Sequence, residues 1–359
     1  MQLRRLWLTD FRGYREADVS FDPGLTAVLG ANGQGKTNLL EAIGYLATLS
    51  SFRGAPTEAL IRSGADRAVV RAEAEREGRE LLLEAELVAS GRNRTQLNKQ
   101  PLRRARDLLG ALRVTVFAPD DLTLVKGSPG DRRSYLDDTL VSLHPRYDEM
   151  RGDLDKVLRQ RGALLKQSGG RLTPEIELTL DVFDAKLVTA GEALASARRN
   201  LVAALEPLLG AAYDAVAQQS AEVRATYDPP WMAEGLAAAL AASRKDDLRR
   251  GVSTVGPHRD ELELVIGAMP SRTHASQGEQ RSLALALRLA AHHVVTEQTD
   301  SSPVLLLDDV FSELDPERSH ALLESLPEGQ TILSTASGLP PGVVPGAVVQ
   351  VHDGVATRG

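Results

Sequence analysis

The octapeptide GANGQGKT at residues 30–37 is the sequence feature that most constrains the fold of this chain. It matches the pattern G-x-x-x-x-G-K-[ST], the P-loop, whose glycine-rich backbone N–H groups surround phosphate oxygens. The apolar run TAVLG precedes the loop and TNLLEAIGYLATL follows it. The sequence therefore predicts a strand, a phosphate-binding turn and a helix from about Gly35 to Leu49, which is the start of an α/β fold.

The residues of this loop have distinct expected roles. Gly30, Gly33 and Gly35 let backbone N–H groups turn toward phosphate oxygens. Lys36 places a positive charge on the outer phosphates and is an expected catalytic residue, and the Thr37 hydroxyl can bind Mg²⁺. We expect the following residues of this segment to contact the nucleotide: Gly30, Ala31, Asn32, Gly33, Gln34, Gly35, Lys36, Thr37 and Asn38.

A P-loop requires a second strand that ends in an acid, and PVLLLDDVFSELD at residues 303–315 supplies one. Its apolar residues 304–307 are typical of a fully buried strand. Asp308 at the carboxyl end is expected to hold Mg²⁺, directly or through water. Asp309 is placed to orient or deprotonate an attacking water. The alternative is a plain strand followed by a helix cap.

The stretch SQGEQRSLALALRL at residues 276–289 joins a polar turn to an apolar helix, expected over 278–297. Ser276 and Glu279 have the spacing of a capping box, in which each side chain satisfies a backbone N–H at the helix start. A helix N-terminus also attracts anions. The turn is therefore either a cap alone or one half of an anion site.

Hydrophobic periodicity divides the chain into two α/β ends and a helical middle part. Strand patterns cover 2–30, 67–100 and 112–119, and α/β alternation returns at the end with a helix over 316–326 and the strand TILST. Between them, 145–167 and 173–206 read as two amphipathic helices joined by the turn SGG, forming an arm. We predict one domain from residues 1–125 and 255–359, and a mostly helical domain over 126–254.

Composition narrows the classes of function. The chain of 359 residues has no cysteine and a net charge of −7. Disulfides and thiolate-bound zinc are excluded, and a reducing cytoplasm fits. The N-terminus lacks the apolar core of a secretory signal, and no apolar run approaches membrane length, so no membrane partner is expected. Any nucleic-acid contact must come from a local basic patch.

The strongest such patch is SGRNRTQLNKQPLRRAR at residues 90–106, which contains no acid. Clustered cations pair with phosphates and do not read bases. Few aromatics accompany them, so contact with the backbone of duplex DNA is favoured over stacking on single strands. A solvated hairpin face is the alternative. The expected DNA-binding residues are Arg92, Arg94, Lys99, Arg103, Arg104 and Arg106.

The order of these motifs carries a resemblance. A P-loop near the N-terminus, SQGEQ before the acidic strand and SELD after it resemble the ABC-type ATPases, specifically their chromosome-maintenance and repair branch. VFAPDDLTLVKGSPGDRRSYLD (116–137) and TVGPHRDELEL (254–264) resemble the RecF family, over nearly the whole chain. The resemblance implies an α/β, ABC-type P-loop ATPase head built from both chain ends, with an inserted α-helical arm domain.

The resemblance also implies site residues. Ser276 and Gly278, with Gln280 in the same turn, bind the γ-phosphate of ATP held by another subunit's P-loop. Asp315 in SELD contacts that subunit, and Arg12 in DFRGY flanks the nucleotide base.

Some positions depart from the ABC pattern. No glutamine is present in FAPDDLTLVKG, where Asp120 and Asp121 occupy the place of a Mg²⁺-sensing residue. No histidine follows TILST, so Ser334 or Thr335 is left to substitute. Asp309 is shorter than the glutamate of transporters, which implies slow hydrolysis.

The resemblance to the RecF family implies a weak ATPase of recombinational repair that uses ATP and Mg²⁺. It dimerises on ATP, binds duplex DNA near gaps or junctions, and helps RecO and RecR to load recombinase. A transporter ATPase subunit is one alternative, disfavoured by the long arm. A non-catalytic, nucleotide-gated DNA scaffold is another. For His258, in the family's own GPHRDE segment, the sequence indicates no chemistry.

Overall fold

In the computed structural model, which describes residues 1–336, 338–339 and 342–358, the chain forms two compact units. The first unit, called the head below, comprises residues 1–122, 208–221 and 276–359. The second, called the helical unit, comprises residues 123–207 and 222–275.

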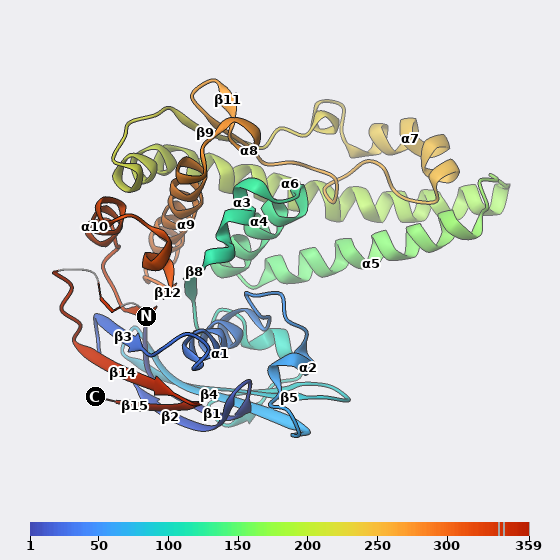
Figure 1. Cartoon of the computed structure of the whole chain (residues 1–359). Coiled ribbons are helices and arrows are strands. Elements are labelled where there is room, and N and C mark those ends of the chain that lie inside the picture. The colour runs from blue at the N-terminus through green and yellow to red at the C-terminus, as the bar shows by residue number, and fades with distance from the viewer. Residues whose placement is uncertain (337, 340–341, 359) are drawn as a thin grey trace. The chain divides into compact units, whose positions relative to one another are not determined.

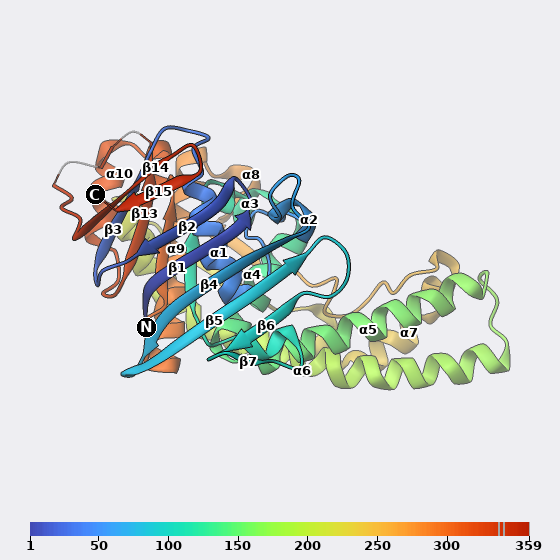
Figure 2. The ribbon, with the colours of Figure 1, turned by 90° about the horizontal axis from the view of Figure 1, so that it is seen from below.

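The head contains an antiparallel sheet with the strand order β2-β1-β4-β5-β6-β7. Figure 2 shows its strands side by side. Apolar and polar residues alternate along the long strands, which buries one face of the sheet. Its strands are β1 (Gln2–Phe11), β2 (Tyr14–Ser20), β4 (Arg67–Arg76), β5 (Arg79–Val88), β6 (Arg94–Leu97) and β7 (Gln100–Pro101).

The second sheet of the head has the order β15-β14-β3-β13-β12-β8. Its strands are parallel except for the edge strand β15. They are β3 (Leu25–Leu29), β8 (Val114–Phe117), β12 (Val304–Asp308), β13 (Thr331–Thr335), β14 (Ala347–His352) and β15 (Val355–Arg358). The β14–β15 hairpin lies beyond the last strand that the sequence predicted.

The P-loop helix α1 (Lys36–Thr48) packs between the two sheets of the head (Figure 1). Val304 and Leu306 of β12 face this inner layer, whereas Leu305 and Leu307 face a second cluster. That cluster includes residues of α9 (Gln277–Thr299) and α10 (Pro316–Glu324). Burial on both faces explains why β12 is continuously apolar.

Short segments complete the head: α2 (Thr57–Leu60), η1 (Ala105–Leu108), η2 (Pro119–Leu122) and η4 (Val310–Glu313). The helical unit contains α3 (Thr123–Lys126), α4 (Pro129–Leu143), α5 (Arg146–Gln167), η3 (Pro230–Ala233), α7 (Leu236–Arg250) and α8 (Ser271–His274). Its small sheet runs β11-β10-β9, from β9 (Val223–Thr226), β10 (Glu263–Ile266) and β11 (Met269–Pro270).

The long helix α6 (Pro174–Ala217) continues past the predicted end at residue 206. Its alanine- and leucine-rich last turns remain helical, and Val216 packs in the head. Pro207 lies inside the helix, at the residue where the helical unit ends. A proline removes one helical hydrogen bond, so the change of unit coincides with a local weak point of the helix.

The division of the chain differs from the predicted domains 1–125, 126–254 and 255–359. Residues 255–275 cluster with the helical unit because β10 pairs antiparallel with β9. Residues 208–221 cluster with the head. The first difference arises from strand pairing and the second from packing of Val216 in the head, and both join segments that are distant in the sequence.

Candidate nucleotide site

The P-loop directly follows β3, and two of its residues have backbone conformations that favour glycine. Gly33 and Gly35 have positive φ angles of 80° and 115°. A Cβ atom on Gly30 would lie 2.3 Å from the carbonyl oxygen of Val351 in β14. The strand that the sequence analysis missed therefore explains why the first residue of the loop must be glycine.

Lys36 is buried and its ammonium lies over the loop. Its Nζ donates hydrogen bonds to the carbonyl oxygens of Gly30 and Ala31, at 2.8 and 2.9 Å. The helix behind it begins at Gly35, which has no side chain to cap it. The loop thus combines a full positive charge with helical N–H donors that can face phosphate oxygens.

Tyr14 supports the loop from the antiparallel sheet. Its hydroxyl donates to the carbonyl oxygen of Gly35 at 2.9 Å, and a Cβ on Gly35 would lie 3.1 Å from that hydroxyl. Burial raises the pKa of Tyr14, so its hydroxyl remains a donor. The sequence analysis did not identify this residue, because its contact joins β2 to a loop that lies 21 residues further along the chain.

Asp308 lies at the carboxyl end of β12, directly beside the P-loop. Its Oδ1 accepts hydrogen bonds from the Thr37 hydroxyl at 2.9 Å and the Ser334 hydroxyl at 2.7 Å. Burial raises the pKa of Asp308, an effect that these two hydrogen bonds oppose. Ser334, named only as a substitute for the absent histidine, is thus part of the acidic cluster.

These residues fit a magnesium ion. The Thr37 hydroxyl and the Asp308 carboxylate, hydrogen-bonded to each other at 2.9 Å, are oxygen donors of the kind that Mg²⁺ prefers and would hold the ion. No cluster of three histidine or acidic side chains suited to a metal occurs among the described residues. Mg²⁺ is usually bound through one or two carboxylates and substrate phosphates and keeps several waters.

Asp309, the residue directly after Asp308, has a strained backbone conformation. Its φ of 49° is in the left-handed region, and its N–H donates to the Ser334 hydroxyl at 3.1 Å. The carboxyl Oδ1 is buried and has no hydrogen-bond partner within the described residues. An unsatisfied buried acceptor is costly, and such groups are typical of functional sites.

The SQGEQ turn forms a second cluster. Ser276 Oγ accepts from the Glu279 N–H at 3.3 Å, and Glu279 Oε2 accepts from the Ser276 N–H at 2.7 Å, which confirms the capping box. The guanidinium of Arg318 lies over Gly278, where a Cβ would come within 2.5 Å of it. Gln280 is buried in the same turn.

Asp315 belongs to this second cluster as the N-cap of α10. Its Oδ1 accepts from the Arg318 N–H at 2.8 Å, and its carboxylate pairs with the Arg318 guanidinium at 3.4 Å. Neither Ser276 nor Asp315 bonds to Lys36, Thr37 or Asp308 within the described residues. One chain therefore presents two separate groups of nucleotide-site candidates.

Two other predicted positions have structural partners. Arg12 forms a bidentate ion pair with the fully buried Glu41 of α1, at 2.7 and 2.8 Å, and donates to the Ala59 carbonyl. Asp121 pairs with Arg288 of α9 at 2.7 Å. These contacts hold the segments before β2 and after β8 against helices of the head.

The predicted DNA-binding cations lie at the β6–β7 end of the antiparallel sheet. We call this set the basic edge: Arg92, Arg94, Lys99, Arg103, Arg104 and Arg106. All are exposed except the half-buried Arg106. Arg104 pairs with Asp107 in a solvent-exposed ion pair at 3.1 Å. The edge thus presents a local positive surface on a chain of net negative charge.

A P-loop helix enclosed between an antiparallel and a parallel sheet, with a SQGEQ-type turn opening a helix beyond the parallel sheet, is the arrangement of an ABC-type ATPase head. A solved Smc head domain from Pyrococcus furiosus has the same fold, with a TM-score of 0.59, 18% identity, and coverage of 100% of this chain and 96% of that one.

More specific relatives cover the whole chain. The RecF/RecN/SMC N terminal domain profile matches residues 2–335. The DNA replication and repair protein RecF of Streptomyces avermitilis is 43% identical over 376 residues, and that of Kineococcus radiotolerans is 44% identical over 395, with 100% of both chains covered in each comparison.

Solved structures agree. The recombination mediator protein RecF-ATP superposes with a TM-score of 0.92 at 28% identity, covering 100% of this chain and 97% of that one. This chain belongs to the RecF family, as the sequence resemblance predicted. None of its described helices is long and apolar enough to cross a bilayer.

Proposed function

We propose that this RecF-family protein of DNA repair binds ATP at its P-loop, pairs with a second copy around the nucleotide, and hydrolyses ATP slowly as a timed switch on DNA. The observation that carries the proposal is the separation of the two residue clusters. Thr37 and Asp308 bond to each other beside Lys36, whereas Ser276 and Asp315 cap other helices. A second copy can bring its own SQGEQ turn to the phosphates held by the first.

In the paired state, Lys36 and the N–H groups of the loop hold the outer phosphates of ATP, and Arg12 lies near the base. Mg²⁺, held by Thr37 and Asp308, would neutralise charge on the phosphate oxygens. Ser276 donates to the γ-phosphate, with Gly278 and Gln280 completing the turn. Asp315 contacts the partner subunit.

Asp309 acts on the attacking water. Its carboxyl Oδ1, which has no hydrogen-bond partner within the described residues, can accept the proton of that water. The water oxygen bonds to the γ-phosphorus while the bond from that phosphorus to the oxygen of the leaving ADP breaks. Its side chain is one methylene shorter than that of glutamate, so its reach to the water is shorter and hydrolysis is slow. Pairing of two heads excludes bulk water, which strengthens the electrostatic interactions in the site.

The basic edge supports binding of duplex DNA through phosphates, near gaps or junctions. We extend the proposal to RecO and RecR as partners that follow on the DNA. The solved relative described as acting in the RecFOR pathway supports this extension. The paired heads would present two basic edges and so form a two-sided contact with duplex.

The experiment that tests the proposal changes Ser276 and measures mass by light scattering with and without ATP. Aspartate is also a good N-cap, so Ser276→Asp retains the helix start but places a carboxylate against the γ-phosphate. We expect normal ATP binding by the monomer and no dimer with ATP. Ser276→Arg, which fills the same space, should behave likewise but lose about 1 kcal/mol of stability with the cap.

Ser276→Thr is the matched control, because it retains both the hydroxyl donor and the cap, and it should still dimerise. If Ser276→Asp dimerises on ATP as the unchanged protein does, the turn is only a helix cap. Phosphate release with and without duplex DNA then separates a slow hydrolase from a non-catalytic scaffold.

A further inference from the structure

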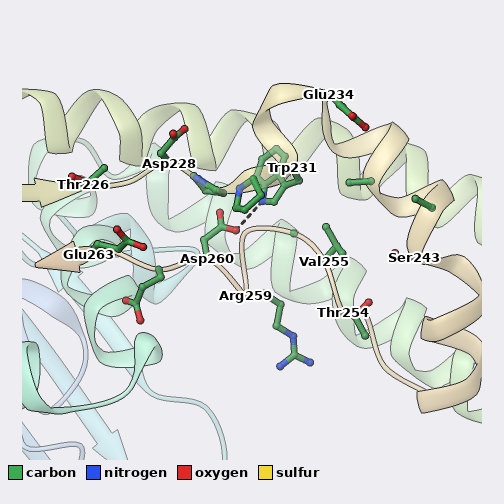
Figure 3. A pocket seen from close by; sticks show the side chains of 16 residues that line it. Thr226, Asp228, Trp231, Glu234, Ser243, Thr254, Val255, Arg259, Asp260 and Glu263 are labelled. Atoms are coloured by element: carbon green, nitrogen blue, oxygen red, sulfur yellow. Dashed lines mark hydrogen bonds between the residues drawn. The ribbon is translucent and has the colours of Figure 1, made fainter. Parts of the chain in front are cut away.

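The helical unit contains a cavity of about 860 Å³. One wall is formed by seven residues of the family-specific segment TVGPHRDELEL: Thr254, Val255, Gly256, Arg259, Asp260, Glu261 and Glu263. Another is formed by residues of η3 and α7 (Figure 3). The volume is in the range of about 300–1,000 Å³ that is usual for ligand pockets. Neither the nucleotide site nor the basic edge uses this segment.

Asp260 of the segment builds the wall of the cavity. Its carboxylate accepts hydrogen bonds from Trp231 Nε1 at 2.8 Å and from the Tyr227 hydroxyl at 2.5 Å (Figure 3 shows the Trp231 contact). Its backbone oxygen accepts from Arg133 at 2.7 Å. Asp260 is buried, and this burial raises its pKa. These contacts fix Trp231 in place, so the cavity is formed before any ligand arrives.

The lining of the cavity is strongly acidic. It contains the carboxylates of Asp228, Glu234, Asp260, Glu261 and Glu263, and one cation, Arg259. Glu261 pairs with Arg132 outside the lining. Asp260 is satisfied by Trp231 and Tyr227.

The remaining three carboxylates are exposed and have no hydrogen bond or ion pair within the described residues: Asp228, Glu234 and Glu263. Arg259 forms no ion pair with these three carboxylates within the described residues, and its Nε and Nη2 atoms donate to the Ser253 carbonyl. The same lining contains the apolar surfaces of Pro229, Pro230, Trp231, Ala239, Ala242 and Val255. The cavity therefore presents negative charge around an apolar surface.

We propose that this acidic cavity docks a segment of a partner protein that carries lysine or arginine beside an apolar side chain. The three unpaired carboxylates attract the cation, and the tryptophan and proline surfaces accept the apolar group. Phosphate groups of DNA or of a nucleotide are repelled by the same carboxylates. The site is distinct from the ATP site in both residues and charge.

The test uses the full-length protein and a fluorescein-labelled peptide of alternating leucine and arginine, measured by fluorescence anisotropy. A peptide with citrulline in place of arginine has the same shape without the charge and should bind at least tenfold more weakly. Glu234→Lys combined with Glu263→Lys should weaken binding of the arginine peptide at least tenfold. Ala242→Trp should do the same by filling the cavity without changing its charge.

The matched control is Asp153→Lys with Asp155→Lys, which makes the same charge change on exposed positions of α5. This double variant of α5 should bind the arginine peptide as the unchanged protein does. The proposal is overturned if the arginine peptide does not bind, if both double variants lose binding equally, or if Ala242→Trp binds the arginine peptide as tightly as the unchanged protein does.

Discussion

The P-loop edge of the head and the centre of the helical unit both bury aspartates, but they treat the charge in opposite ways. In the head, Asp308 receives hydrogen bonds from two hydroxyl groups, and no lysine or arginine pairs with it within the described residues. In the helical unit, the fully buried Arg161 lies between Asp184 and Asp247, at 2.6 and 2.7 Å.

This difference distinguishes the ligand site at Asp308 from a structural centre, by which we mean Arg161 with Asp184 and Asp247. A buried carboxylate without a cation is costly, and Mg²⁺ or another positive group can relieve that cost. A buried arginine between two aspartates is already compensated and has no need of a ligand. Buried aspartates therefore serve binding beside the P-loop and architecture around Arg161.

Loss of the Lys36 ammonium at the P-loop should have the largest effect on nucleotide binding. Lys36→Met removes the full positive charge from the outer phosphates, and ATP affinity should fall at least about 100-fold. Calorimetry measures this loss, and Lys99→Met on the basic edge makes the same chemical change elsewhere and should bind ATP normally. Equal affinities of the two variants would contradict the assignment of the P-loop.

Removing the cation of the structural centre should affect stability and leave nucleotide binding intact. Arg161→Met leaves Asp184 and Asp247 without compensation and should cost about 3–5 kcal/mol of unfolding free energy. The exposed Arg159→Met on the same helix should cost less than about 0.5 kcal/mol.

The two tryptophans of the chain, Trp7 and Trp231, lie in different units. A Trp7→Phe background therefore lets fluorescence follow urea unfolding of the helical unit alone. An unchanged transition in Arg161→Met, or a loss of ATP affinity, would break the comparison between the two buried sites.

The head also contains a buried base that stays neutral. Burial lowers the pKa of His292 to about 4, while its ring nitrogens contact the hydroxyls of Thr115 and Ser302. The unfolded chain takes up this proton near pH 6.5, before the folded head does. The head should therefore lose roughly 3 kcal/mol of stability as the pH falls from 6.5 to 4, and none above 6.5.

His292→Gln should remove this loss, because the amide has no proton to gain over that range. The exposed His320→Gln is the control and should retain the full dependence. Unfolding midpoints in urea at a series of pH values give the measurement. A pH dependence that persists in His292→Gln would assign it to another group.

The smallest effect for each residue is expected at the basic edge. Reversal of Arg103, Arg104 and Arg106 to glutamate should weaken duplex binding and lower the slope of log K against log salt by roughly 0.9 for each DNA phosphate that is no longer neutralised. Reversal of Arg159, Arg199 and Arg250 in the helical unit changes the net charge equally and serves as control. If both triple variants alter the slope alike, DNA binding depends on overall charge and not on this edge.

Sequence alone determined the parts of this protein whose physics is local. The P-loop, the buried strand before Asp308 and the capping box of Ser276 and Glu279 depend on residues within a few positions of one another. The two long helices followed from their periodicity. The order of these motifs indicated the ABC-type ATPases, and the segments 116–137 and 254–264 indicated the family that the comparisons confirmed.

The tertiary structure decided which distant residues meet. Ser334 bonds to Asp308 because β13 lies parallel to β12, and Gly30 must be glycine because β14 passes within contact distance of it. β10 joins the helical unit by pairing with β9, and Asp260 fixes Trp231 29 residues away. Such contacts depend on strand pairing and side-chain packing across long sequence separations, whereas motifs and periodicity describe only the chain near each residue.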